Sequence, residues 1–302
     1  MKNKRTSLKL AVTAILFAMA AFIASCKKDS DPISGEVSQT VSNEATQDSQ
    51  QDEVDDMATG QLNKGDSKGR FLGATDGRVA CAYVTFADTT ESHKATGTLT
   101  IDFDKTPAGD DNAAGCTDGH GNTRKGMIVI TWTGGRWYSP GSVITITLNN
   151  YSINGVVLNG TRVLTNITSV DHPLIVTWTV ISDITATWPD SKTATRQVHK
   201  TRAWDILGGT VTVTQSAGAD SAASGTTRRG VSYTVTIQTA IVFDLTCVGT
   251  SKVYIPVSGV KVITFNDKTV TIDFGSGTCD NTFTVTYNGK TDTFSGDNSS
   301  SN

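Results

Sequence analysis

Four cysteines in the body of the chain carry the chemistry that the sequence constrains best: Cys81, Cys116, Cys247 and Cys279. Their thiols can pair as disulfides or ligate a metal. A zinc site needs thiolates or histidines at short spacing, whereas no C-x-x-C motif occurs and the four histidines are scattered. The even number therefore favours disulfides, which persist in an oxidising compartment. Spacing by itself leaves all three pairings open.

The fifth cysteine, Cys26, ends a segment with the features of an export signal. A basic start precedes the apolar run 10–24, whose length of about 15 residues suits a signal peptide and is too short for a membrane-spanning helix. The run closes on Ile23-Ala24-Ser25-Cys26, which resembles a lipobox. We expect a signal peptide over residues 1–25 and diacylation of the Cys26 thiol, so that acyl chains anchor the protein to a bilayer. The alternative is an ordinary secretory signal.

Carboxylates at four positions are the candidates for acid–base chemistry: Asp102, Asp110, Asp111 and Asp273. A glycosidase would need two of them to face each other across a cleft. Asp102 and Asp273 instead follow the same short motif in two parts of the chain, which a structural repeat explains better. Asp110, Asp111 and the segment 117–122 could ligate calcium, but Asp and Gly are also common in ordinary turns. We expect no catalytic residues, no cofactor and no metal site.

Several protein classes are disfavoured by what the sequence lacks. It contains no G-x-S-x-G nucleophile motif, no phosphate-binding loop and no dinucleotide fingerprint. The charge is nearly balanced, with 26 basic and 29 acidic residues, and no basic block lies outside the signal. A nucleic acid partner is therefore not expected. About 230 residues remain beyond the signal and the polar segment after it, enough for one large domain or two small ones.

Trp137 and Tyr138 are candidates for contact with a ligand. They lie in a glycine-rich turn, where aromatic rings can stack on a sugar face or dock a partner. The alternative is that one ring packs back over the hairpin.

A second candidate for ligand contact is the segment 193–204. Three of its basic residues, Arg196, Lys200 and Arg202, share one face of the expected strand. They could hold an anionic ligand at their tips, because their long stems can cover an apolar face. We favour the alternative that this is an edge strand protected by its charge.

The elements that position these residues are expected to be strands. From about residue 73 onward, apolar side chains alternate with Thr, Ser and Asp, which is the period of a strand with one buried face. Such runs cover 144–148, 174–188, 231–237, 270–274 and 283–287. Asn154-Gly155, Asn159-Gly160 and Asn288-Gly289 are typical of hairpin turns. The sequence predicts an all-β, antiparallel, hairpin-rich domain over residues 71–302; a sandwich, a curled meander and a sheet closed on itself all fit.

The motif Thr-Ile-Asp-Phe occurs twice, ending at Phe103 and at Phe274. Each copy lies between two cysteines and is followed by a further β-run. We interpret the stretches of about 75–135 and 240–295 as a degenerate duplicated unit. Each unit would then close its own bridge, Cys81–Cys116 and Cys247–Cys279, and each bridge would contribute ~3 kcal/mol in the chain-entropy model.

Residues 26–70 are expected to form a lipidated, polar tether. No Pro or Gly occurs between residues 36 and 59, and Val37, Val41 and Ala45 repeat at four-residue steps. A short acidic helix could therefore form on a narrow apolar stripe. We favour a disordered spacer that lifts the domain off the membrane, with a weak helix inside it.

Several stretches together resemble a known family. The run 27–31, Lys-Lys-Asp-Ser-Asp, is similar to the export signal of surface lipoproteins in Bacteroidetes, from which the second lysine departs. The stretches 124–134, 140–147, 150–155, 159–162 and 270–279 resemble uncharacterised β-rich lipoproteins of Bacteroidetes. This resemblance covers most of residues 73–295. It implies a lipoprotein and brings no activity with it.

We therefore expect a lipoprotein anchored in the outer membrane, at the periplasmic face or the cell surface, that binds a partner or supports the envelope without catalysis. Its expected partners are the bilayer, through Cys26, and a glycan or another outer-membrane protein. A hydrolase acting on glycans or peptides is the alternative, and it would need a cleft lined by Asp102, Asp273 or the loop around Asp110 and Asp111. A purely structural component would present an unbroken polar surface.

Overall fold

The computed structural model describes residues 35–64, 77–87, 96–119, 121–205, 212–217, 222–244, 246–247 and 255–295. The expected signal peptide (residues 1–25), Cys26 and the run 27–31 lie outside these residues, as does His120. In the part of the chain that is described, no helix is both long enough and apolar enough to cross a membrane.

One helix and fifteen strands make up the described fold. The helix α1 spans Gly35–Lys64. The strands are β1 (Tyr83–Ala87), β2 (Gly97–Asp102), β3 (Cys116–Thr117), β4 (Thr123–Thr133), β5 (Val143–Ile153), β6 (Val156–Asn166), β7 (Ile175–Thr187), β8 (Thr193–Asp205), β9 (Thr212–Ala217), β10 (Ala223–Thr226), β11 (Ser232–Asp244), β12 (Ser258–Phe265), β13 (Lys268–Ser276), β14 (Thr282–Tyr287) and β15 (Lys290–Ser295).

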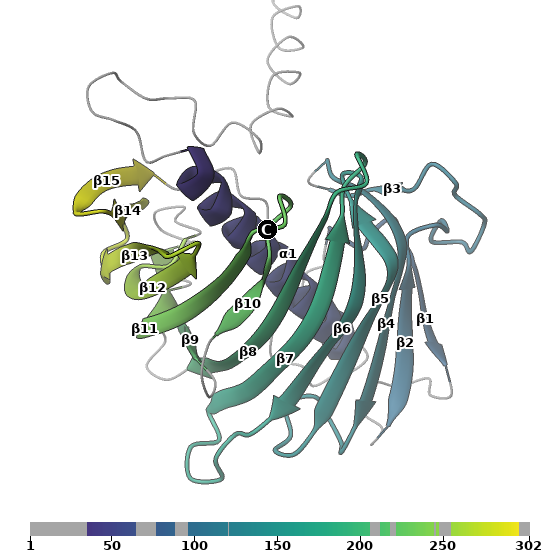
Figure 1. Ribbon diagram of the computed structural model, residues 1–302. Coiled ribbons are helices and arrows are strands. Elements are labelled where there is room, and N and C mark those ends of the chain that lie inside the picture. The colour runs from purple at the N-terminus through teal and green to yellow at the C-terminus, as the bar shows by residue number, and fades with distance from the viewer. Residues whose placement is uncertain are drawn as a thin grey trace, which may run out of the picture.

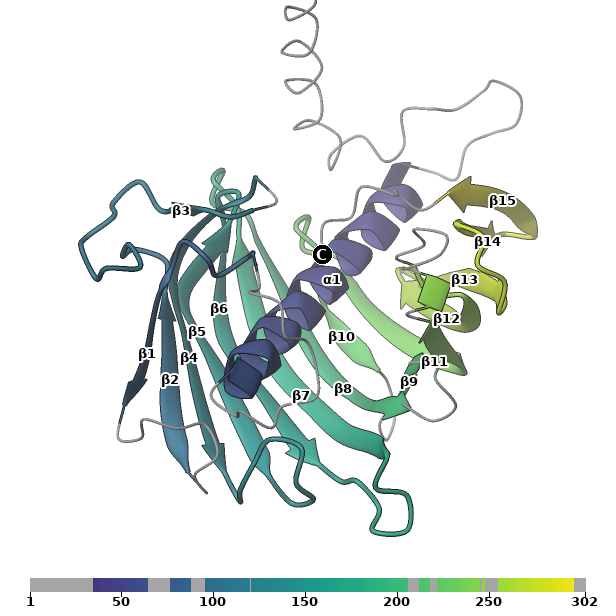
Figure 2. The same ribbon diagram turned by 180° about the vertical axis from the view of Figure 1, so that it is seen from behind.

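All the strands belong to one antiparallel sheet, in the order β1-β2-β4-β5-β6-β7-β8-β10-β11-β12-β13-β14-β15. β3 pairs with β4, and β9 pairs with both β8 and β11. Neighbours in the sheet are mostly neighbours in the sequence, and the sheet curls so that α1 lies across its concave face (Figures 1 and 2). The prediction of an all-β, hairpin-rich antiparallel sheet is confirmed.

The alternation of side chains in β7 shows how the sequence forms this curved layer. Trp178, Val180 and Ile184 point to the concave side and are buried, whereas Ile181 on the other side is 53% exposed. Because successive side chains of a strand point to opposite faces, the period-two pattern sorts them into an inner and an outer set. Neighbouring strands repeat this sorting, so the inner set forms one continuous core.

Two of the three predicted hairpin turns are confirmed. Asn154-Gly155 joins β5 to β6 and Asn288-Gly289 joins β14 to β15, with all four residues at positive φ. The prediction for Asn159-Gly160 is wrong, because both residues lie inside β6. Gly160 has a φ of +133°, and a Cβ there would lie 2.0 Å from the carbonyl oxygen of Asp183 in β7. Glycine is needed at this position for the close approach of two strands.

The segment 35–64, for which we favoured a disordered spacer, is instead a helix buried against the sheet. Near its end, Val54, Met57, Ala58 and Leu62 belong to the core of β2, β4, β5, β6 and β7. At its start, Val37 is fully buried in a second core beneath β11, β12, β13 and β14. The correction has a physical cause: α1 buries apolar side chains at both ends, which a free spacer cannot do.

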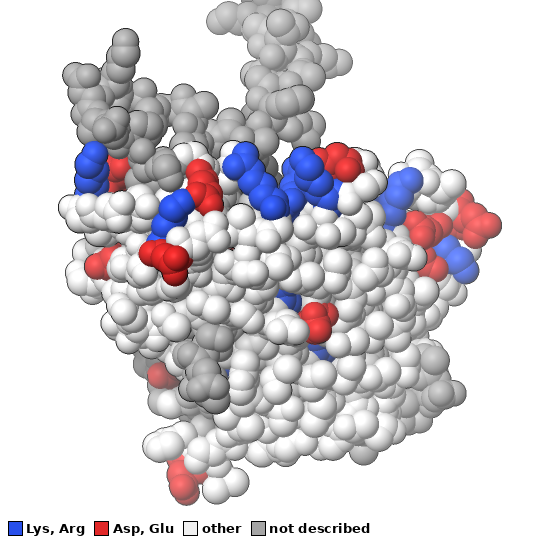
Figure 3. All heavy atoms as spheres, viewed as in Figure 1, with Lys and Arg blue, Asp and Glu red and all other residues white. Residues whose placement is uncertain are grey.

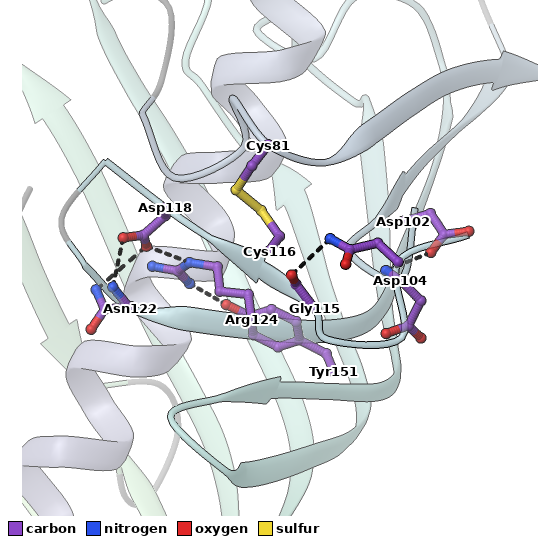
Figure 4. Close-up of a disulfide and its surroundings, with 10 residues drawn as sticks. Cys81, Asp102, Asp104, Gly115, Cys116, Asp118, Asn122, Arg124 and Tyr151 are labelled. Carbon is purple, nitrogen blue, oxygen red and sulfur yellow. Dashed lines mark hydrogen bonds and ion pairs between the residues drawn. A yellow bond between two sulfur atoms is a disulfide. The ribbon is translucent and has the colours of Figure 1, made fainter. Parts of the chain in front are cut away.

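Both disulfides pair as the repeated motif predicts. Cys81 bonds to Cys116 and Cys247 bonds to Cys279, with Cα atoms 5.5 and 5.3 Å apart. The motif aspartates have the same local role in both places, since Asp102 accepts a hydrogen bond from the amide of Asp104 and Asp273 accepts one from the amide of Gly275. Figure 4 shows the first bridge beside the turn that Asp102 closes.

Replacing both Cys81 and Cys116 by Ser is expected to lower the free energy of unfolding by ~3–4 kcal/mol, because the bridge restricts the unfolded chain. Urea unfolding without reductant measures this change. As a control, reductant should destabilise the parent protein, which loses both bridges, more than it destabilises the variant, which loses only Cys247–Cys279. Identical urea midpoints for the parent and the variant would contradict the prediction.

Candidate functional site

The helix α1 is strongly acidic along the face that meets the sheet. Its acidic residues are Glu36, Glu44, Asp48, Asp52, Glu53, Asp55 and Asp56, and its one basic residue is Lys64. Glu44, Asp48, Asp52 and Asp56 recur every fourth residue, a spacing at which like charges destabilise an isolated helix. The helix therefore depends on cations supplied from elsewhere in the chain.

The concave face of the sheet supplies these cations. Six basic side chains, each at most 9% exposed, point inward from four strands: Arg124 in β4, Arg162 in β6, Arg196, Lys200 and Arg202 in β8, and Lys261 in β12. Charged side chains are almost never this buried unless they are paired. We call the contact between these six side chains and the acids of α1 the helix–sheet ion-pair interface.

Arg162 and Asp55 form the most enclosed pair of this interface. Nε and Nη2 of Arg162 donate to the two carboxylate oxygens of Asp55, at 2.7 and 2.5 Å. The remaining nitrogen of Arg162 donates to Gln51 of α1 at 2.6 Å and to Ser182 of β7 at 3.3 Å. A guanidinium bound at both edges in this way has a fixed geometry, so the pair fixes the register between α1 and β6.

Asp48 lies at the centre of the interface and contacts three cations. Arg196 Nη2 lies 2.8 Å from its carboxylate, Lys261 Nζ 3.0 Å and Lys200 Nζ 3.2 Å. Burial opposes ionisation of Asp48, but the three positive charges outweigh burial and hold its pKa well below the ordinary value. Asp48 is therefore ionised in the folded protein at neutral pH.

Asp56, in the last third of α1, is held much less firmly. Arg202 Nη2 lies 3.4 Å from its carboxylate, and the side chain is 38% exposed. Although part of this side chain reaches solvent, the loss of hydration against the sheet, together with the nearby charges of Asp52 and Asp55, outweighs Arg202 and Arg78 and raises the pKa of Asp56 to about 6. Ionised Asp56 is thus a weak point of the interface.

Asp118, the carboxylate of the segment 117–122, belongs to the same interface. Asp118 accepts a hydrogen bond from Arg124 Nε at 2.7 Å and another from the amide of Asn122 at 2.9 Å, as Figure 4 shows. Arg124 also contacts Tyr151 and donates to Glu53 of α1 at 2.5 Å. Among the described residues, no three His, Cys, Asp or Glu side chains gather as a metal site would require. The ion pair with Arg124 therefore explains why Asp118 carries a buried charge.

The basic residues of 193–204 lie at the centre of the interface, and the prediction of an edge strand is wrong. β8 pairs with β7 along its whole length and with β9 and β10 on its other side. Arg196, Lys200 and Arg202 point into the concave face, where the acids of α1 are their anionic partner. An interior strand tolerates them because every one of these charges meets an opposite charge.

The candidate acids are not brought together. Asp102 ends β2 and Asp273 lies in β13, and eight strands separate these two along the sheet. Asp110 and Asp111 are exposed in the loop after β2, where the amide of Asp110 bonds to Thr106. The distance across the sheet rules out a dyad of Asp102 with Asp273 in this fold.

Trp137 and Tyr138 lie in the loop between β4 and β5, and both are partly buried. The ring of Trp137 meets Trp178 edge-on, with 5.2 Å between ring centroids, and Tyr138 at 5.4 Å. The Tyr138 hydroxyl accepts a hydrogen bond from Arg136. One ring thus packs over the hairpin and the core, and ligand contact by these two residues stays a prediction.

Sequence patterns gave no sign of a hollow on the convex side of the sheet. It has a volume of about 420 Å³ and lies over β6, β7, β8 and β10. We call it the outer hollow. Figure 3 views this side of the molecule, where charged atoms gather along one margin and are sparse over the middle.

Comparison of the chain with protein-family models, with curated proteins and with solved structures finds no match.

Replacing Arg162 by Met should lower the free energy of unfolding by ~3–5 kcal/mol, because Asp55 is left buried without a partner. The double variant Arg162→Met, Asp55→Leu should recover most of this loss, since neither charge then remains. Urea unfolding of the parent, both single variants and the double variant measures the coupling. Strictly additive losses would contradict the pairing.

The stability of the parent protein should fall as the pH rises from about 4 to about 6, and Asp56→Asn should remove this part of the pH dependence. The pKa of Asp56 is raised in the folded state from 3.8 to about 6, so folding is favoured while the group is protonated and becomes less favourable as pH rises through about 6. The pH dependence of the thermal midpoint of both proteins tests this. Asp48→Asn is the control and should destabilise at pH 7, because the pKa of Asp48 is shifted downward. The same pH dependence of the thermal midpoint in both proteins between pH 4 and pH 7 would refute the raised pKa of Asp56.

Proposed function

We propose that this chain is a lipid-anchored binding protein of the bacterial envelope that acts without catalysis. The observation that carries the proposal is the convex face of the sheet, which lies opposite α1 and on which the described residues line the outer hollow. The string Ile23-Ala24-Ser25-Cys26 supports the anchor, and two disulfides suit the oxidising compartment that an exported protein enters.

Anchorage at Cys26 would hold the domain close to the bilayer. Eight residues separate Cys26 from Gly35, the first residue of α1. A fully extended chain of this length reaches about 30 Å. The ion pairs and apolar contacts of α1 hold it against the sheet. The distance between the domain and the bilayer would therefore be limited by the eight-residue link, and not by the longer tether over residues 26–70 that the sequence suggested.

The distribution of exposed apolar residues supports binding over a purely structural role. Ile167, Val170 and Leu174, in the loop between β6 and β7, are 49%, 81% and 49% exposed. The loop is held in place by hydrogen bonds, for example from the amide of Ile167 to the carbonyl of Thr177 at 2.8 Å. A scaffold with an unbroken polar surface would not hold apolar side chains in water on an ordered loop.

A hydrolase is the alternative function, and the described residues offer it less support. The acids that could act as a pair, Asp102 and Asp273, lie eight strands apart, and Asp110 and Asp111 project from a loop. A turnover on polysaccharide or peptide that survives repurification and is lost with one substitution would establish this alternative.

The anchor can be tested by replacing Cys26 with Ser in cells fed an alkyne analogue of palmitate. The parent protein should carry the label and sediment with the membranes, and Cys26→Ser should lose both properties because no thiol remains to be acylated. Ser30→Ala lies outside the lipobox and should behave like the parent. Labelled, membrane-bound Cys26→Ser protein would contradict lipidation at this residue.

A further inference from the structure

The side chains around the outer hollow are ordered by the strand register into two rows. Directly paired positions of β6, β7, β8 and β10 form a polar row: Thr161, Asp183, Gln197 and Ser224. Two residues further along the strands, paired positions of β6, β7 and β8 form a second row: Val163, Ile181 and His199. The polar row thus runs alongside two apolar side chains, Val163 and Ile181, followed by His199.

We propose that the outer hollow binds a neutral polysaccharide, with the polar row bonding to hydroxyl groups and the Val163–Ile181 strip contacting the C–H faces of the sugar rings. This inference rests on the proposed function, for which it names a ligand class and a site.

The charge of the hollow selects against anionic polymers. Among the described residues, its lining contains no Lys or Arg, and Asp183 is the one carboxylate. The nearby basic residues of β8 point to the opposite face, where the acids of α1 occupy them. A nucleic acid or an acidic polysaccharide would meet a negative charge here and no cation.

The backbone around the hollow is closed to an extended peptide. β6, β7 and β8 are each paired on both sides, so none of them offers a free edge for a peptide to join as an added strand. The lining also lacks the continuous apolar groove that an amphipathic helix needs, because the polar row runs through it. Recognition must therefore come from side chains.

The polar row suits a ligand rich in hydroxyl groups. Its members are spaced by the ~4.8 Å that separates neighbouring strands, so it spans ~14 Å and can contact successive units of a polymer. Gln197 Nε2 lies 3.4 Å from Asp183 Oδ2, a contact that orients the carboxylate as an acceptor. Hydroxyl, amide and carboxylate groups together offer both donors and acceptors. Ile181, 53% exposed, provides apolar surface beside them.

The outer hollow lies beside the point where the partner strand of β8 changes. Lys200 of β8 pairs with Ala217 of β9, whereas Val198 pairs with Ala223 of β10.

Binding of the full-length protein in detergent to beads coated with dextran, mannan or β-glucan tests the proposal, with polygalacturonate beads as the acidic probe. We expect retention on a neutral polymer and an increase in Kd of about tenfold or more for the double variant Gln197→Ala, His199→Ala. The matched control is Gln238→Ala, His172→Ala, which removes the same two exposed side-chain types outside the hollow and should leave Kd unchanged. Equal thermal midpoints confirm that both variants fold.

Each other outcome overturns a definite part of the proposal. Retention that the hollow variant leaves unchanged places the site elsewhere, and retention on polygalacturonate alone overturns the neutral ligand class. Retention on no polymer at the highest bead loading overturns polysaccharide binding at the hollow. The anchor is judged separately by the labelling of Cys26, so its failure and the failure of this inference are distinguishable.

Discussion

The fold depends on the pairing of α1 with the basic side chains of the concave face. Six cations lie inside the sheet at no more than 9% exposure, and their anionic partners come mainly from one helix at the start of the described chain. Removing the partner of a buried charge costs ~3–5 kcal/mol, while a whole domain is stable by only about 5–15 kcal/mol. The sheet without α1 would therefore be unstable, and helix and sheet must form one cooperative unit.

The position of α1 has two consequences for function. Its apolar ends join two cores, that of β2 to β7 and that of β11 to β14, so it connects the two halves of a long, curved sheet. By filling the concave side, α1 also leaves the outward side chains of β6, β7 and β8 on the opposite face, where the described residues line the outer hollow.

Local sequence patterns predicted the parts of the fold that local forces determine. The alternating runs became strands, Asn154-Gly155 and Asn288-Gly289 became turns, and the repeated motif indicated the correct cysteine pairs. Features that depend on distant partners were missed. The acids of α1 look like a solvated segment until their cations, at least 71 residues later, are placed opposite them.

The other differences between prediction and structure have the same cause, which is dependence on distant parts of the chain. Arg196, Lys200 and Arg202 suggest an edge strand only if their charges face water, and Gly160 suggests a turn only if the approach of β7 is unknown. The sequence does contain a pattern that indicates the interface. Acidic residues recur at four-residue steps in 44–56, and basic residues of one parity occur in 196–202. The outer hollow arises from the register between strands, which no single run of sequence contains.

Hydrogen exchange of the α1 amides in the intact protein at pH 7 shows whether α1 is bound to the sheet. If the ion pairs and the apolar ends of α1 hold it to the sheet, its amides between Glu44 and Ala58 should be protected and should open together with those of β6 and β8. Exchange of the same α1 amides at the rate of an unstructured peptide, while the sheet stays protected, would mean that this segment is a free spacer and that the account given for the basic concave face is wrong.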